Sequence, residues 1–115
     1  MSKQKKFWLW LPVVLYALVI FSSSAIPGQY VPELFPGSDK IFHFLEYLPF
    51  GFLIVRALSR SIHVSRLHSL LMTIFVVILF SLSDEFHQLF VPARQFDLVD
   101  AFFDLCGATI GSVLY

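Results

Sequence analysis

Apolar residues fall into four long runs, separated by short polar stretches. The first run extends from Phe7 to Phe21, and residues 22–26 can lengthen it to about 20 residues, the length that a helix needs to cross the hydrocarbon of a bilayer. The connection that follows contains three prolines and two glycines, which end helices. The pattern predicts an all-α polytopic membrane protein, a bundle of four transmembrane helices at approximately residues 7–26, 40–58, 67–88 and 97–115.

Composition supports a membrane protein. The 115 residues are 57% hydrophobic and only 14% charged, whereas about a quarter of the residues of a soluble domain are charged. A soluble protein of this size would need more polar residues to cover its surface. We expect a single membrane domain over residues 1–115, with the lipid bilayer as its surroundings and no nucleic-acid partner. The single Cys106 cannot form a disulfide within the chain.

Charges are segregated along the predicted spans. One side of the membrane receives six of the eight basic residues: Lys3, Lys5, Lys6, Arg56, Arg60 and Arg66. The other side receives Lys40, Arg94 and all eight acidic residues: Glu33, Asp39, Glu46, Asp84, Glu85, Asp97, Asp100 and Asp104. Because cytoplasmic loops carry an excess of Lys and Arg, we expect a plasma-membrane or inner-membrane protein with both termini in the cytoplasm.

The first apolar run has a second interpretation. A basic start, an apolar core and small residues at 23–25 are also typical of a cleaved signal peptide. In either case the second span begins on the outer side, so the orientation of the polar residues does not depend on this choice.

Two polar stripes enter the predicted membrane from the outer side. Asp39, His43 and Glu46 share one face of the second span, since they lie four and three residues apart. Asp97, Asp100 and Asp104 form a similar stripe on the fourth span, and the third span ends in Asp84, Glu85, His87 and Gln88. At a rise of about 1.5 Å per residue, Glu46 and Asp104 lie roughly 10 Å below the helix starts. Ionisable groups at that depth must face each other or a wet cavity.

This pattern predicts an outward-facing acidic pocket. Its candidate residues are Asp39, Lys40, His43, Glu46, Tyr47, Glu85, Gln88, Arg94, Asp97, Asp100 and Asp104. Two cations cannot neutralise eight acids, so protons, a divalent cation or a cationic part of a ligand would complete the pocket. His43, Glu46, Glu85 and His87 are candidate metal ligands, although no HExxH or Cys-pair motif specifies a metal. Arg94 is the candidate contact for an anionic group, because guanidinium binds phosphate and carboxylate in bidentate fashion.

The outer ends of the spans resemble a known family. SDKIFHFLEYLPFG and then SDEFHQLFVPARQFDLVDAFFDLCGATIG are similar to the VanZ-like family, whose pattern is D-K-x-x-H-x-x-x-Y, an acidic-x-x-Q helix end, a P-x-R loop and D-x-x-D-x-x-x-N/D-x-x-G-x-x-x-G. The pattern falls on Asp39, Lys40, His43, Tyr47, Glu85, Gln88, Pro92, Arg94, Asp97, Asp100, Asp104, Gly107 and Gly111. Asp104 stands where many relatives carry Asn, and Ala93 where Gly is usual.

The resemblance implies a protein of the cell envelope, from a family named for resistance to the glycopeptide antibiotic teicoplanin. Our leading hypothesis is a non-enzymatic protein that engages a lipid-like, lipid-linked or lipoglycopeptide ligand in the acidic pocket. The alternatives are a metal-dependent membrane enzyme acting on a lipid headgroup, a cation-coupled permeation path and a structural partner subunit. Gly107 and Gly111 have the spacing that allows close helix approach, either within the bundle or in a dimer.

Overall fold

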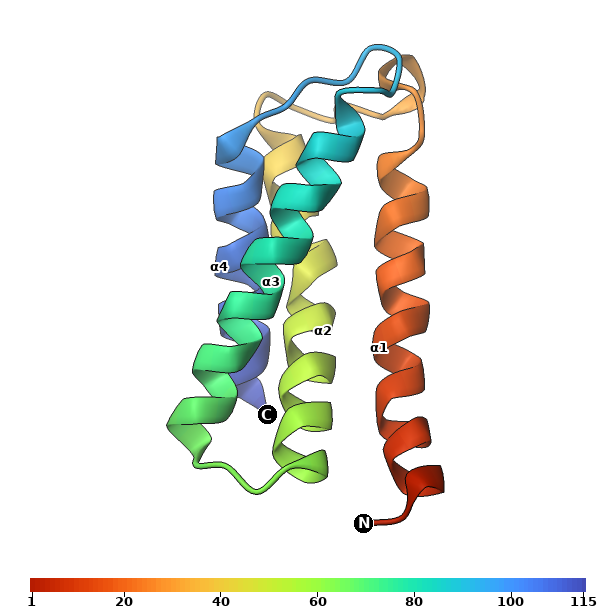
Figure 1. Ribbon diagram of the computed structural model, residues 1–115. Coiled ribbons are helices and arrows are strands. Elements are labelled where there is room, and N and C mark those ends of the chain that lie inside the picture. Colours follow the sequence, from red (N-terminus) through yellow and green to blue (C-terminus); the bar gives the residue numbers. More distant parts are fainter.

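The computed structural model describes residues 1–115 and consists of helices without strands (Figure 1). The elements in chain order are α1 (Lys3–Ser24), the short 3-10 helix η1 (Gly28–Tyr30), α2 (Ser38–Ser61), α3 (Arg66–Gln88) and α4 (Leu98–Leu114). The predicted all-α bundle of four helices is therefore confirmed.

Capping groups, rather than hydropathy alone, set the helix ends. α1 begins four residues before the apolar run that predicted it, because the Ser2 side chain accepts a hydrogen bond of 3.2 Å from the backbone N–H of Lys5. Asp97 caps α4 in the same way, with its carboxylate 2.9 Å from the backbone nitrogen of Val99. α2 also extends beyond the predicted residues 40–58 at both ends. The polar flanks of the spans are thus helical.

Three of the helices, α1, α2 and α3, are long and apolar enough to cross a membrane. α4 is shorter, with 17 residues, and reaches about 25 Å at 1.5 Å per residue. It lies beside α2 within an elongated bundle whose longest dimension is 46 Å (Figure 1). The helices thus identify a membrane protein.

The bundle has two chemically different ends (Figure 1). The α1–α2 and α3–α4 loops form one end, which we call the polar end because all eight carboxylates lie in these loops or in the adjoining helix segments. The chain termini and the α2–α3 connection form the other, the basic end, with six Lys and Arg residues. At the basic end a guanidinium nitrogen of Arg66 donates to the carbonyls of Ser112 and Val113, 3.2 Å away in each case, and so caps α4.

The most extensive helix contact joins α2 to α4 and depends on glycines. A Cβ atom added to Gly107 would lie 2.1 Å from the carbonyl oxygen of Phe44, and one added to Gly111 would lie 1.8 Å from that of Leu48. On the facing helix, Gly51 meets the backbone of Ala108 in the same way. The predicted close approach occurs within the bundle. α2 covers Gly107 and Gly111, so of the two arrangements that the spacing allows, the structure shows the one within the bundle.

The two loops at the polar end touch each other. The backbone N–H of Gly28 donates to the carbonyl of Pro92 at 2.8 Å, and Ala93 has a positive φ of 60°. A side chain is strained in this left-handed conformation, which glycine adopts without steric cost. Contact between the loops places Arg94 beside the end of α1.

Below the polar residues the bundle is closed by an apolar core. Tyr47, Phe50 and Phe80 form an aromatic group, with ring centroids 4.9 to 6.3 Å apart. Ile54, Ala57 and Val77 are fully buried in the same core. This apolar core therefore separates the polar cluster from the basic end of the bundle.

Candidate functional site

Lys40 lies at the centre of a carboxylate group at the polar end. Its ammonium nitrogen is 3.0 Å from Asp39 and 2.7 Å from Asp97, and it also pairs with Asp100. These residues come from the first turn of α2 and the start of α4, as the two predicted stripes require. Because three carboxylates surround Lys40, its positive charge is compensated within the protein.

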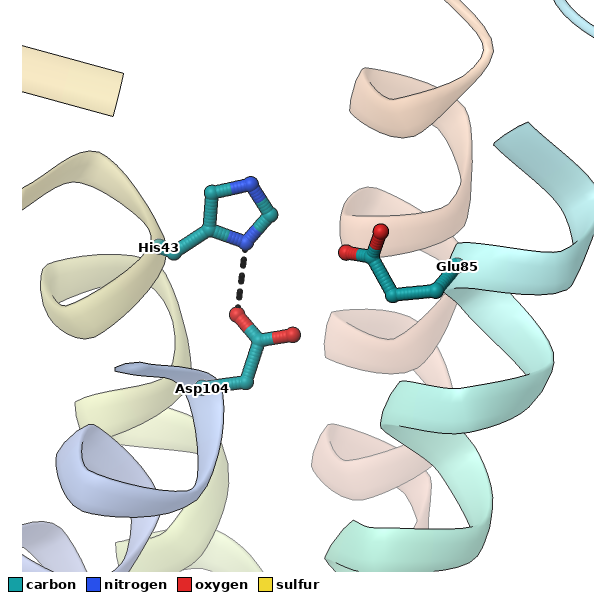
Figure 2. A group of neighbouring side chains, drawn as sticks. All are labelled: His43, Glu85 and Asp104. Carbon is teal, nitrogen blue, oxygen red and sulfur yellow. Dashed lines mark hydrogen bonds and ion pairs between the residues drawn. The ribbon is translucent and has the colours of Figure 1, made fainter. Parts of the chain in front are cut away.

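One turn deeper, His43 joins α2 to α4. Its Nδ1 lies 2.6 Å from Oδ1 of Asp104, as Figure 2 shows, and its Nε2 lies 3.5 Å from Oδ2 of Asp100. The other oxygen of Asp104 accepts a hydrogen bond from the Ser81 hydroxyl of α3 at 2.7 Å. Asp104 is completely buried, so two partners on two helices satisfy a carboxylate that has no access to water.

Glu85 enters the same region from α3 and is only partly satisfied. Its side chain is 0% exposed, and Oε2 accepts a hydrogen bond of 3.2 Å from the backbone N–H of Asp97. Its other oxygen, Oε1, is buried without a hydrogen-bond partner, as is the hydroxyl of Tyr47. Figure 2 shows the Glu85 carboxylate directed toward His43 and Asp104. An unpaired buried carboxylate oxygen is costly and calls for a partner.

Two more carboxylates are held by α1. Glu46 accepts a hydrogen bond of 2.7 Å from Ser23, and Asp84 accepts one of 2.6 Å from Ser24. The hydroxyl of Tyr16 donates to the backbone carbonyl of Glu46. Our reasoning from the sequence missed these three donors, because it considered the serines only as an extension of the span or a cleavage signal. Hydroxyls in a predicted span were the available signal, since they must find partners in the membrane.

Arg94 makes no ion pair in the structure. Its Nε donates to the carbonyl of Ile26 at 3.0 Å and its Nη2 to that of Ser23 at 3.3 Å, so it caps the end of α1. These two bonds use two of the five N–H donors of the guanidinium. Its role as an anion contact stays a prediction.

Two adjacent cavities open this region. The first, of about 330 Å³, is mostly polar; Asp39, Gln88, Asp97 and Asp100 are among its lining residues. The second, of about 290 Å³, lies between α1 and α2, where Ile26 and Phe42 face His43 and Glu46. Both cavities are lined by Arg94, Asp39, Val31 and Pro32. Gln88, a candidate pocket residue, is largely buried at the end of α3 and lines the first cavity.

The candidate metal ligands separate into two places. His43 and Glu85 belong to a group with Asp104, in which one donor atom of each residue lies within 4.8 Å of the others. Glu46 instead binds Ser23. His87 stacks on Phe21, with ring centroids 4.1 Å apart, and its Nδ1 is 3.4 Å from the Ser24 hydroxyl. The group of candidate metal ligands therefore contains Asp104 in place of Glu46 and His87, which contact α1 instead.

At the rim of the site, Asp97 has a perturbed ionisation. The hydrogen bond from Lys40 lowers the pKa of the Asp97 carboxyl, and the bond from the backbone of Val99 lowers it further. Asp97 therefore remains negatively charged at neutral pH and holds the start of α4 against α2.

These features define a class: a small helical membrane protein in which carboxylates from three helices gather at one end of the bundle, with four buried ones on α3 and α4. The sequence matches the VanZ/LLP1 family over residues 3–115, essentially the whole chain, and the chain belongs to this family. The resemblance found in its motifs is thus confirmed. No match was found among curated proteins or among solved structures.

Proposed function

We propose that this protein acts in the plasma or inner membrane of the cell envelope, with both termini in the cytoplasm and the polar end outside. The support is the separation of charge along the bundle: the basic end carries six Lys and Arg residues and no carboxylate. Positive residues are retained on the cytoplasmic side during insertion. Because Ser23 and Ser24 bind Glu46 and Asp84, we further propose that α1 stays in the mature protein.

At the polar end, the protein engages a lipid-like or lipoglycopeptide ligand without chemical conversion. The observation that carries this proposal is that Arg94 lines both a polar and a partly apolar cavity. A ligand with an anionic headgroup and a hydrocarbon chain would place the headgroup at the free N–H groups of Arg94. Its chain would follow Ile26 and Phe42 toward the bilayer. Lys40, which already binds three carboxylates, contributes less to the headgroup than the sequence suggested.

For the cell, the proposed consequence is a change in susceptibility to teicoplanin-type antibiotics. Both lipid-linked wall precursors and lipid-tailed glycopeptides reside at the outer leaflet, where the two cavities would open. Binding of either type of molecule in the pocket would change how much antibiotic binds to the wall precursor.

Replacing Arg94 tests this function. Cells that express the chain should tolerate more teicoplanin than cells without it, and Arg94→Gln should remove that gain while the protein still reaches the membrane. Arg60→Gln, at the basic end, is the matched control and should keep it. Tolerance to a glycopeptide that lacks an acyl chain should change less. Equal tolerance with wild type and Arg94→Gln at equal membrane abundance would refute the proposal.

A further inference from the structure

We infer that His43, Glu85 and Asp104 form a binding site for one divalent transition-metal ion, with Zn²⁺ as the best fit. The site goes beyond the proposed lipid ligand and does not depend on it. The three residues come from α2, α3 and α4, and one donor atom of each lies within 4.8 Å of the other two (Figure 2). Ligands that converge from three helices onto one buried point are the usual way in which bundles build metal sites.

The unpaired oxygen of Glu85 is an independent sign of a missing partner. Oε1 is buried in a side chain that is 0% exposed, and no group of the protein donates to it. Protein interiors rarely leave such an atom unsatisfied, because the loss of its hydration costs about 1 to 3 kcal/mol or more for a charged group. Since the carboxylate is directed toward His43 and Asp104, a cation bound between them would satisfy it.

The two carboxylate ligands are also held by hydrogen bonds to their outer oxygens, and the histidine has a carboxylate near its outer nitrogen. Oε2 of Glu85 is held by the backbone N–H of Asp97 at 3.2 Å, and Oδ2 of Asp104 by the Ser81 hydroxyl at 2.7 Å. Nε2 of His43 lies 3.5 Å from the Asp100 carboxylate. Metal-bound histidines typically direct their second nitrogen to a carboxylate, and ligand carboxylates are similarly anchored. These outer contacts leave Nδ1 of His43, Oδ1 of Asp104 and Oε1 of Glu85 as the donor atoms.

The charges around the site favour a cation. Lys40 is shared among Asp39, Asp97 and Asp100, and so it does not neutralise Glu85 or Asp104. The nearby Glu46 and Asp84 have only hydroxyl partners from α1. In the absence of a metal, His43 alone would offset both carboxylates, and its Nδ1 would bridge to Asp104 at the observed 2.6 Å. A divalent ion would replace that bridge and balance both acids.

The donor set selects the class of metal. One imidazole with two carboxylates suits Zn²⁺ and related transition metals, whereas Ca²⁺ and Mg²⁺ prefer oxygen ligands alone. Three protein ligands are also the number found in zinc sites that bind water or a substrate group at a fourth position.

Metal titration of the purified full chain tests this inference. The protein is prepared without a polyhistidine tag, stripped with a chelator and titrated separately with Zn²⁺, Mn²⁺ and Ca²⁺; bound metal is measured by elemental analysis after desalting. We expect one Zn²⁺ per chain and weaker binding of Ca²⁺. The Zn²⁺ affinity should fall in acid, because the ligands must lose their protons.

Variants show whether the metal sits at this site. His43→Gln and Glu85→Gln should each weaken Zn²⁺ binding by at least about 100-fold, since even loss of an outer contact costs about 10- to 100-fold. His63→Gln, in the α2–α3 connection, is the matched control and should bind like wild type. Helix content from circular dichroism and a monodisperse elution profile confirm that each variant is folded. Folded wild type without stoichiometric Zn²⁺, equal affinity in all variants or no preference over Ca²⁺ would overturn the site.

Failure of the metal site and failure of the proposed function are distinguishable. Arg94→Gln leaves all three metal ligands intact and should bind Zn²⁺ normally, even though teicoplanin tolerance is lost. If the chain binds Zn²⁺ but Arg94→Gln keeps its tolerance, the site stands and the lipid-ligand proposal falls. If tolerance depends on Arg94 and no metal binds, the lipid-ligand proposal stands and the metal site falls.

Discussion

The same helices build both halves of this bundle, but different interactions hold each half together. Toward the basic end, α2 and α4 pack through glycines and small side chains, and the core contains Ile54, Ala57 and Val77. Toward the polar end, the same pair is joined by ion pairs, and Asp104 and Glu85 are fully buried. Side-chain packing and the Arg66 cap on α4 account for the first half. The second half contains more buried charge than stability requires, because apolar residues of similar size are often at least as stabilising as buried ion pairs.

The glycine contact is where we expect the largest effect. Gly111→Val would place a side chain against the carbonyl of Leu48, which belongs to backbone and cannot move aside. The added Cβ alone would lie 1.8 Å from that oxygen, so the cost should exceed both the about 1 to 3 kcal/mol that is common for overpacking and the cost of the variants below, and folded protein should not be recovered from detergent extracts. Val113→Leu is the control, because Val113 is exposed on the same helix. Normal yield and melting temperature for Gly111→Val would show that α2 and α4 are not packed this closely.

Removal of a buried carboxylate should have the next largest effect. Asp104→Leu leaves His43 and Ser81 unpaired, and loss of one partner of a buried pair costs about 3 to 5 kcal/mol. Val77→Ala in the apolar half removes two buried methyl groups and should cost about 2 kcal/mol. Unfolding in mixed micelles measures both. Asp104→Asn, which keeps hydrogen bonds to both neighbours, should cost least, and a larger loss from Asp104→Asn than from Asp104→Leu would contradict this reading.

The smallest expected effect is on the pH dependence of stability, and it comes from Asp97 at the edge of the site. The lowered pKa of Asp97 means that its ion pair with Lys40 stabilises the fold above the ordinary value of 3.8 and is lost as the pH falls through the lowered value. Asp97→Asn can still cap α4 but cannot pair with Lys40. Its stability should therefore be slightly lower at neutral pH and fall less steeply below about pH 4. Melting curves between pH 3 and 7 compare the two proteins. If the melting temperature fell equally steeply with pH in both proteins, Asp97 would not contribute to the loss of stability in acid.

The sequence predicted the fold well because hydropathy and helix length are local properties. Spacing also placed the stripe of Asp39 and His43 opposite that of Asp100 and Asp104, since residues three and four apart must share a helix face. Where the prediction was imprecise, the cause was local capping, as at the start of α1. The spacing of Gly107 and Gly111 predicted close approach of a helix, but it could not tell which helix approaches, α2 of the same chain or a helix of a second chain.

Details of the site could not be read from spacing. Ser23, Ser24 and Tyr16 bind the carboxylate region only because α1 packs beside α2 and α3, which depends on how the helices associate. The same association separates His87 from His43 and brings Asp104 to Glu85. Sequence thus predicted which residues belong to the polar end, while tertiary packing determined their partners.

Coupling between His43 and Asp104 is the most direct test that ionisable side chains from separate helices meet at the polar end of the bundle. A double-mutant cycle of His43→Leu and Asp104→Leu, followed by unfolding in mixed micelles, measures that coupling free energy. Because the two side chains lie 2.6 Å apart, the loss in free energy of unfolding of the double variant should be smaller than the sum of the two single losses. We expect a difference of at least about 1 kcal/mol. Additive losses would mean that the two side chains do not meet, which would contradict the account.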